Sequence, residues 1–196
     1  MPSAIGRISY GAGHLPGAAI CTGALIAPDL VLTAAHCVAS AAKAPAGIRF
    51  EADYAAGQSK AAGFGAEVLL DPDLTQTGPI PFAQDMALLR LSTPIDPALV
   101  PPLAIGPLAA KGDLQVFGYA RSAAEAKPVR TPCPVLQVSR VGLLLGCAVV
   151  SGHSGAPVLA QGASGFHIVG IIVARAGGSR ALAARPKAWI SAGPTR

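Results

Sequence analysis

Glycine and proline recur so often along this chain that they exclude long helices. The sequence contains 23 Gly and 18 Pro in 196 residues. Proline lacks the backbone N–H that a helix needs, and glycine loses the most conformational entropy when it is ordered. Between these residues lie short apolar segments, a pattern typical of many short strands joined by tight turns. The sequence therefore predicts a β-rich fold and argues against a helical bundle.

The composition predicts a folded chain of one domain. Hydrophobic residues make up 52% of the sequence and charged residues 13%, so the chain carries too much apolar surface and too little charge to remain disordered. Its length suits one substantial domain or two closely packed subdomains. We predict one domain spanning residues 1–196.

The apolar segments fall into two groups. The first group comprises residues 18–27, 30–35, 48–50, 66–70 and 86–91, and the second comprises residues 114–119, 135–138, 143–150, 157–159 and 166–174. Between Pro94 and Pro107 prolines recur, and proline has no backbone N–H to donate to a neighbouring strand. This segment is therefore predicted to be an extended connection. We therefore expect two β-halves, at about 1–100 and 108–196. Alanine-rich residues 39–46 and 123–126 fit a helical turn or a loop equally well.

A membrane-spanning segment is not expected, although the mean hydropathy is positive. Residues 141–174 contain no Asp, Glu, Lys or Arg. Gly, Ser, His, Pro and Gln nevertheless interrupt this stretch every few residues, whereas a spanning helix needs about 20 predominantly apolar residues. The first seven residues have no apolar core of a secretion signal, so we expect any signal peptide to have been removed before Met1.

The net charge of +5 does not indicate a nucleic-acid partner. Most Lys and Arg residues are scattered, and no basic run alternates with aromatic residues, as binding to single strands requires. A modest basic cluster near the C-terminus consists of Arg175, Arg180, Arg185, Lys187 and Arg196. The charge predicts no more than mild attraction to acidic surfaces.

Three short segments carry chemically reactive side chains. Residues 32–37 (LTAAHC) place His36 at the end of an apolar strand. In residues 84–91 (QDMALLRL), Asp85 directly precedes another apolar strand, a position that also suits a turn or capping residue. Residues 151–157 (SGHSGAP) place Ser154 between glycines, which let consecutive N–H groups point toward the serine oxygen. Together the segments supply a base, a carboxylate and a nucleophile.

In this order the three segments resemble the trypsin-like (chymotrypsin-fold) serine proteases. The similarity rests on residues 33–37 (TAAHC), 85–89 (DMALL) and 152–157 (GHSGAP), and it spans nearly the whole chain. Residues 4–7 (AIGR), 118–119 (GY) and 169–173 (VGIIV) match as well. The compact chain is similar to the bacterial secreted or periplasmic branch, which includes glutamyl endopeptidases. The resemblance implies an all-β fold of two packed six-stranded antiparallel Greek-key β-barrels, with the active site between them.

The resemblance also implies a role for each reactive residue. His36 would act as general base and then general acid, Asp85 would hold its tautomer, and Ser154 would be the nucleophile. The backbone N–H groups of Gly152 and Ser154 would form the oxyanion hole. This chemistry needs no cofactor.

We expect no metal site. His14, His153 and His167 have no setting comparable to that of His36, and no Cys/His cluster has the spacing of a zinc site.

Two positions depart from the family pattern. His153 stands where the animal digestive branch has an aspartate that binds a newly cut N-terminal ammonium, so activation by N-terminal insertion is not expected. Ala156 stands where many relatives have glycine, which adds one methyl group that we expect to be tolerated.

The resemblance favours a disulfide between Cys21 and Cys37, which leaves Cys133 to pair with Cys147. One bridge in each half indicates an oxidising compartment, so we expect a secreted or periplasmic protein. The alternative is that Cys147 is a free buried thiol.

By analogy with the family, two segments would form the wall of the specificity pocket. They consist of Ala148, Val149, Val150, Ile172, Val173, Ala174 and Arg175. The absence of Asp and Glu argues against Arg or Lys as the preferred substrate residue. Ile172 stands where the glutamyl endopeptidases have a histidine, and Arg175 would lie at the rim. We therefore expect a preference for small or medium apolar residues such as Ala, Val or Leu.

The sequence thus predicts a serine endopeptidase that acts on proteins or peptides. It carries no signal for the oligomeric state, and a monomer is taken by default. One alternative is a catalytically silent chain of the same fold that binds peptides. Another is a dedicated esterase or a protease with a single partner protein.

Overall fold

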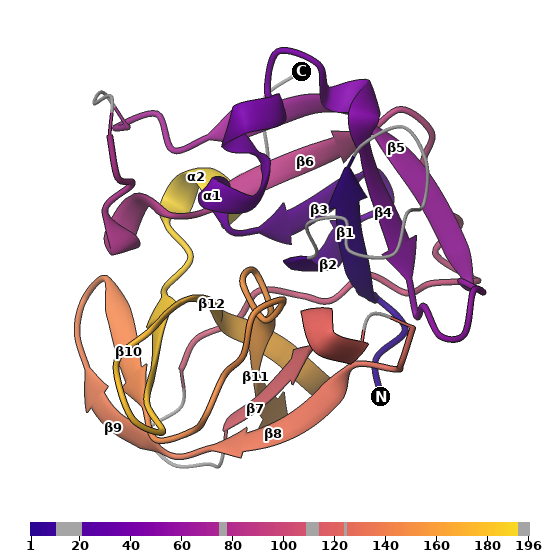
Figure 1. Cartoon of the computed structure of the whole chain (residues 1–196). Helices are drawn as coiled ribbons and strands as arrows, with labels where there is room; N and C mark the ends of the chain where they lie inside the picture. Colours follow the sequence, from indigo (N-terminus) through magenta and orange to yellow (C-terminus); the bar gives the residue numbers. More distant parts are fainter. Residues whose placement is uncertain (11–20, 75–77, 109–113, 124, 192–196) are drawn as a thin grey trace.

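The computed structural model describes residues 1–10, 21–74, 78–108, 114–123 and 125–191. Within these residues the chain forms thirteen strands and only short helices. The strands make two sheets, one from each half of the chain (Figure 1). The predicted all-β fold is confirmed.

The first sheet is a closed antiparallel barrel with the strand order β1-β2-β3-β6-β5-β4. Its strands are β1 (Ile5–Tyr10), β2 (Cys21–Ala27), β3 (Leu30–Thr33), β4 (Ile48–Ala52), β5 (Ala61–Leu70) and β6 (Ala87–Leu91). β1 closes the barrel by pairing with both β2 and β4. Closure leaves no free strand edge and fixes where each strand ends.

The second sheet has seven strands in the order β8-β7-β11-β12-β13-β10-β9. They are β7 (Leu114–Gly118), β8 (Val129–Cys133), β9 (Val135–Val138), β10 (Gly142–Leu145), β11 (Pro157–Gly162), β12 (Gly165–Arg175) and β13 (Ala181–Ala184). The edge strands β8 and β9 are consecutive in the chain and separated only by Pro134. The sheet therefore curls so that its two edge strands, β8 and β9, follow each other in the chain. The resemblance implied six strands here, and the structure has seven because this bent segment counts as two strands.

The helices are all short. They are α1 (Ala35–Val38), η1 (Ala39–Ala41), η2 (Pro45–Gly47), η3 (Phe82–Gln84), η4 (Arg121–Ala123) and α2 (Ala188–Ser191). Of the alanine-rich residues 39–46, residues 39–41 and 45–46 lie in turns of 3-10 helix, and residues 42–44 form a turn between them. Of the second such stretch, residue 124 lies outside the described residues. No helix in the described ranges is long and apolar enough to span a membrane.

Three strands have no counterpart among the predicted segments. β1 carries Arg7, β8 carries both Arg130 and Pro132, and β13 is mostly alanine, so none has a strong apolar signal. Each is nevertheless held by pairing with neighbouring strands. Conversely, the predicted segment 143–150 is a strand only as far as Leu145.

One apolar core joins the two sheets. The larger cluster of buried side chains contains the interior of the first barrel together with Phe117, Ile168 and Ile171 of the second sheet. The proline-rich connection bonds to both sheets, because the Ile95 N–H donates to Pro28 and the Gly106 N–H donates to Ile168. After β13 the chain returns toward the first barrel, where Ile190 of α2 is buried in the larger cluster (Figure 1). The junction of the sheets is thus packed rather than hinged.

Candidate active site

His36 lies where a buried strand of the first barrel ends. All four residues of β3 are buried, and after Thr33 the chain turns into α1, which carries His36. The core therefore holds the backbone of this residue, while its side chain remains 40% exposed. A fixed but accessible imidazole suits proton transfer to and from a bound molecule.

Asp85 contacts His36 through both carboxylate oxygens. Its Oδ2 lies 2.7 Å from His36 Nδ1, and its Oδ1 accepts the His36 backbone N–H at 2.9 Å. The side chain is only 8% exposed. Because an ionised carboxylate can only accept a hydrogen bond, Nδ1 carries the proton of the neutral ring, and the lone pair is at Nε2, on the side away from Asp85. Asp85 is therefore a partner of the ring and not merely a turn residue.

Ser154 lies in a tight turn that requires glycine. Gly152 and Gly155 have φ values of 104° and 78°, a region that residues with a Cβ rarely adopt. A Cβ on Gly155 would overlap the Thr22 carbonyl oxygen and Thr33 Oγ1, which belong to the first barrel. The turn is thus pressed against the other sheet.

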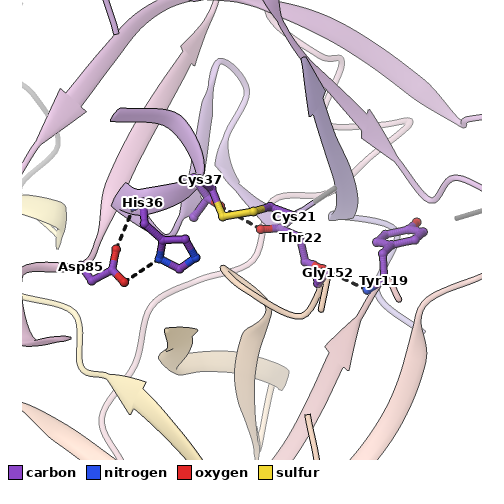
Figure 2. Close-up of a disulfide and its surroundings, with 8 residues drawn as sticks. Cys21, Thr22, His36, Cys37, Asp85, Tyr119 and Gly152 are labelled. Carbon is purple, nitrogen blue, oxygen red and sulfur yellow. Dashed lines mark hydrogen bonds and ion pairs between the residues drawn. A yellow bond between two sulfur atoms is a disulfide. The ribbon is translucent and has the colours of Figure 1, made fainter. Parts of the chain in front are cut away.

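A short series of bonds links this turn to the residue that follows His36. The Thr22 N–H donates to the Ser154 carbonyl at 2.8 Å. Thr22 follows Cys21, which is bonded to Cys37, the residue after His36. Figure 2 shows Asp85 and Gly152 on opposite sides of the His36 ring. Among the described residues the Ser154 hydroxyl has no hydrogen bond, and a bond between nucleophile and base is often long before substrate binds.

The backbone N–H groups of the turn differ in their partners. The His153 N–H donates to Val150 at 3.0 Å, and the Gly155 N–H donates to Ile172 at 2.7 Å. Within the described part of the chain, the N–H groups of Gly152 and Ser154 donate to no other residue. These are the two groups predicted to form the oxyanion hole, so both donors remain available.

Both disulfides have the pairing that the family resemblance implied. Cys21 is bonded to Cys37 and Cys133 to Cys147, and the described residues contain no free cysteine. The alternative of a free Cys147 is therefore wrong for this structure. The ligand atoms of Cys21, His36 and Cys37 lie within 4.8 Å of one another. With the sulfurs joined, however, no thiolate is present to bind a metal.

His153 is buried beside the predicted nucleophile. Its side chain packs against Gly118, where an added Cβ would lie 2.7 Å from the ring. Within the described residues neither ring nitrogen has a hydrogen-bond partner. Burial lowers the pKa of His153, because the charged imidazolium would lose its hydration without gaining a partner. A neutral ring therefore fills the position next to Ser154.

The seven predicted pocket residues differ in their exposure. Val149 and Ile172 are buried in the smaller core of the second sheet, and Val173 is buried in the larger core. The exposed residues are Ala148, Val150 and Arg175, and Ala174 is half-buried. The accessible residues of the predicted wall therefore lie at the ends of the two segments.

The remaining sequence candidates have other surroundings. His167 Nε2 lies 3.0 Å from the Pro107 carbonyl oxygen, which ties the connection to β12. In the basic cluster, Arg185 donates to the Ser139 carbonyl, and Lys187 pairs with Asp71. His14 and Arg196 lie outside the described residues.

Sequence analysis missed Thr22, which contacts the predicted nucleophile turn. Its hydroxyl donates to the Gly152 carbonyl at 2.8 Å and accepts the Tyr119 N–H at 2.9 Å. The side chain is fully buried. Its position next to Cys21 is the one signal in the sequence that could have drawn attention to it.

An ionic cluster that joins buried residues to the exposed Glu125 was also missed. Arg7 on β1 bonds to Glu51 at 2.8 Å, and its guanidinium lies 3.4 Å from the centre of the Tyr54 ring. Glu125, in the loop after β7, binds both Arg7 and the Tyr54 hydroxyl. The hydrogen bond from Tyr54, together with the hydrogen bond and the positive charge of Arg7, lowers the pKa of Glu125. The cluster joins the first barrel to a loop of the second sheet.

A closed antiparallel barrel packed on a second curled sheet, with a histidine–carboxylate pair at the junction, defines a protein of the chymotrypsin-like fold. The sequence model of the trypsin-like peptidase domain matches residues 21–171. The match covers more than half of the chain, so the chain belongs to this family.

A solved structure of a Glu endopeptidase in complex with MPD is similar to the whole fold. The TM-score is 0.77 at 21% sequence identity, and the match covers 97% of this chain and 91% of that chain. At this identity the likeness establishes the fold alone. A search of curated proteins found no significant match.

Proposed function

We propose that this chain is a serine endopeptidase in which Ser154, His36 and Asp85 act as one unit. The observation that carries the proposal is the double contact of Asp85 with His36, which leaves Nε2 of the ring free to take a proton. The glycine turn of Ser154 is bonded to Thr22, one residue from the disulfide that joins Cys21 to the residue after His36. This supports placing nucleophile and base together.

The proposed reaction proceeds through an acyl-enzyme. Ser154 Oγ attacks the scissile carbonyl carbon while His36 Nε2 takes its proton, and Asp85 stabilises the resulting imidazolium. The N–H groups of Gly152 and Ser154 then bind the oxyanion. The same proton is delivered to the leaving amine as the peptide bond breaks. Water, activated by His36, hydrolyses the ester and restores the serine.

For the residue before the scissile bond, we infer a preference for small or medium apolar side chains. Both exposed residues of the first predicted segment, Ala148 and Val150, are apolar, and none of the seven residues is acidic. Selectivity per methylene should be only about 1–3 kcal/mol. Cleavage of a peptide library tests this inference, and dominant cutting after Arg, Lys or Glu would contradict it without touching the proposed catalytic unit.

An alternative is a chain that binds peptides without cleaving them. It is favoured by the Ser154 hydroxyl, which has no hydrogen bond among the described residues. Labelling with a fluorophosphonate probe separates the two functions, because only an activated serine reacts. We expect labelling of the wild-type chain and none of Ser154→Ala.

Substitutions within the proposed unit test it further. Ser154→Ala and His36→Ala should each abolish proteolysis, and the double variant should be little worse than either, because the residues work together. Asp85→Asn should reduce kcat by about 10⁴-fold by permitting the wrong tautomer of His36. Additive losses in the double variant would refute the assignment.

We also infer a secreted or periplasmic location and a protein or peptide substrate. Two disulfides persist most readily in an oxidising compartment. Finding the chain in the cytoplasm with reduced cysteines would contradict the inferred location.

A further inference from the structure

We propose that Thr22 is a positioning residue that holds the oxyanion-hole donors in their working orientation. The proposal rests on the proposed protease function and adds to it a residue outside the Ser–His–Asp unit. It concerns the hydroxyl of Thr22, which joins the nucleophile turn to the loop that supports it. Figure 2 shows Thr22 between the disulfide and Gly152.

Thr22 uses every polar group that it has. The N–H donates to the Ser154 carbonyl and the carbonyl accepts from Thr33 Oγ1, each at 2.8 Å. The hydroxyl donates its one hydrogen to the Gly152 carbonyl and accepts the Tyr119 N–H. Two of these bonds therefore hold the peptide unit that joins Gly152 to His153 and the one that joins Ser154 to Gly155. Between the two anchors lies the peptide that carries the Ser154 N–H, so its freedom to rotate is small.

The Gly152 N–H is held from the other side. It belongs to the peptide unit whose carbonyl is that of Ser151, and this carbonyl accepts the Arg121 N–H at 2.8 Å. Because N–H and C=O point in opposite directions across a trans peptide, holding the carbonyl aims the N–H away from Arg121. The loop carrying Arg121 begins at Tyr119, whose N–H is the one bound by the Thr22 hydroxyl.

The far end of that loop is also fixed to the first barrel. The Glu125 carbonyl accepts the Ala56 N–H at 2.7 Å, and its carboxylate binds Arg7 and Tyr54. The loop thus spans two anchors on the first barrel. Of these two anchors, the one at Thr22 also bonds to the Gly152 carbonyl, so this hydroxyl couples the position of the loop to that of the nucleophile turn.

The chemistry of the contact requires a hydroxyl. The two partners are a carbonyl and an N–H, so the side chain must donate and accept at once, which serine or threonine can do and valine cannot. Thr22→Val keeps the shape but leaves both partners buried without a hydrogen bond. Such groups shift to find new partners, and here that shift would rotate the peptide units that carry the oxyanion donors.

The test compares Thr22→Val, Thr22→Ala and Thr22→Ser with the wild-type chain. We expect the first two to lower kcat by roughly 10- to 100-fold with little change in KM, less than the 10²–10³-fold typical of deleting a donor. Binding of a peptide aldehyde, whose adduct places an oxyanion in the hole, should weaken by the same factor. Thr22→Ser keeps the hydroxyl, so its kcat and aldehyde affinity should stay near the wild-type values. If Thr22→Val does not fold, the comparison of Thr22→Ser with Thr22→Ala tests the proposal.

A matched control is Ser139→Ala. The Ser139 hydroxyl also donates and accepts at once, bonding to the Gly142 carbonyl and N–H at 3.0 Å in the β9–β10 turn. Its removal should lower the melting temperature without lowering kcat. The proposal is overturned if Thr22→Val retains kcat and aldehyde affinity within about twofold of an active wild type. If the valine variant does not fold, the same outcome for Thr22→Ala overturns it. It is also overturned if Thr22→Ser does not keep both quantities near their wild-type values. A wild-type chain that neither hydrolyses peptides nor reacts with fluorophosphonate would refute the protease function itself, and this proposal with it.

Discussion

Replacing each disulfide in turn by two alanines should lower stability equally but activity unequally. The bonded cysteines are 16 residues apart in Cys21–Cys37 and 14 apart in Cys133–Cys147. The entropy of closing loops of these lengths gives about 3 kcal/mol for each bridge at 25 °C. In a domain of this size 1 kcal/mol shifts the melting temperature by about 2–4 °C, so each loss should be roughly 6–12 °C. All four sulfurs are buried, so lost packing adds a similar amount to both.

Activity should respond mainly to the first bridge. Cys37 follows His36, and Cys21 precedes Thr22, which binds the Ser154 carbonyl. Without this bridge, His36 and Ser154 are held less firmly relative to each other. A misplacement of about 1 Å can lower the rate on the order of 10²-fold. Cys147 instead precedes the predicted pocket wall, so the second double variant should change KM more than kcat.

Thermal unfolding and steady-state kinetics on both double variants provide the test, at a temperature where each is folded. The reasoning fails if the Cys133/Cys147 variant loses as much kcat as the Cys21/Cys37 variant. It also fails if the two melting temperatures fall by amounts that differ more than about twofold, since nearly equal loops predict nearly equal losses.

Further predictions concern His153 and the N-terminus. Because the pKa of His153 is lowered in the folded chain, the ring binds a proton below about pH 6.5 in the unfolded chain but stays neutral in the folded chain. The free energy of unfolding should therefore fall as the pH drops from about 6.5 toward the lowered pKa, and denaturant titrations should find a flatter profile for His153→Phe. Gly118→Ala should destabilise by about 1–3 kcal/mol through its clash with His153, and a double-mutant cycle with His153→Ala should recover part of the loss. Extending the chain before the exposed Met1 should leave kcat/KM unchanged, because no carboxylate at position 153 awaits an N-terminal ammonium; silencing by the extension, reversed on its removal, would contradict this.

Local patterns were enough to predict the fold class and the candidate residues. Short apolar runs between Gly and Pro predicted strands, because these residues end elements through their own backbone chemistry. The motifs around His36, Asp85 and Ser154 are each contiguous, so their resemblance to a protease could be read without coordinates. Strands β8 and β13 were missed because their own residues carry little signal, and neighbouring strands decide their conformation.

Only the tertiary structure decided how the site is supported. The Thr22 hydroxyl meets Gly152 across 130 residues and Tyr119 across 97, and Arg7 meets Glu125 across 118. Nothing in the local sequence of a threonine or an arginine states which distant groups it will bind, because those partners are brought near by the closure and packing of two sheets. The same holds for His153, which the sequence places beside Ser154 but which packing alone makes buried, neutral and without a partner among the described residues. Local chemistry thus determined which residues could react, and long-range packing determined how they are held.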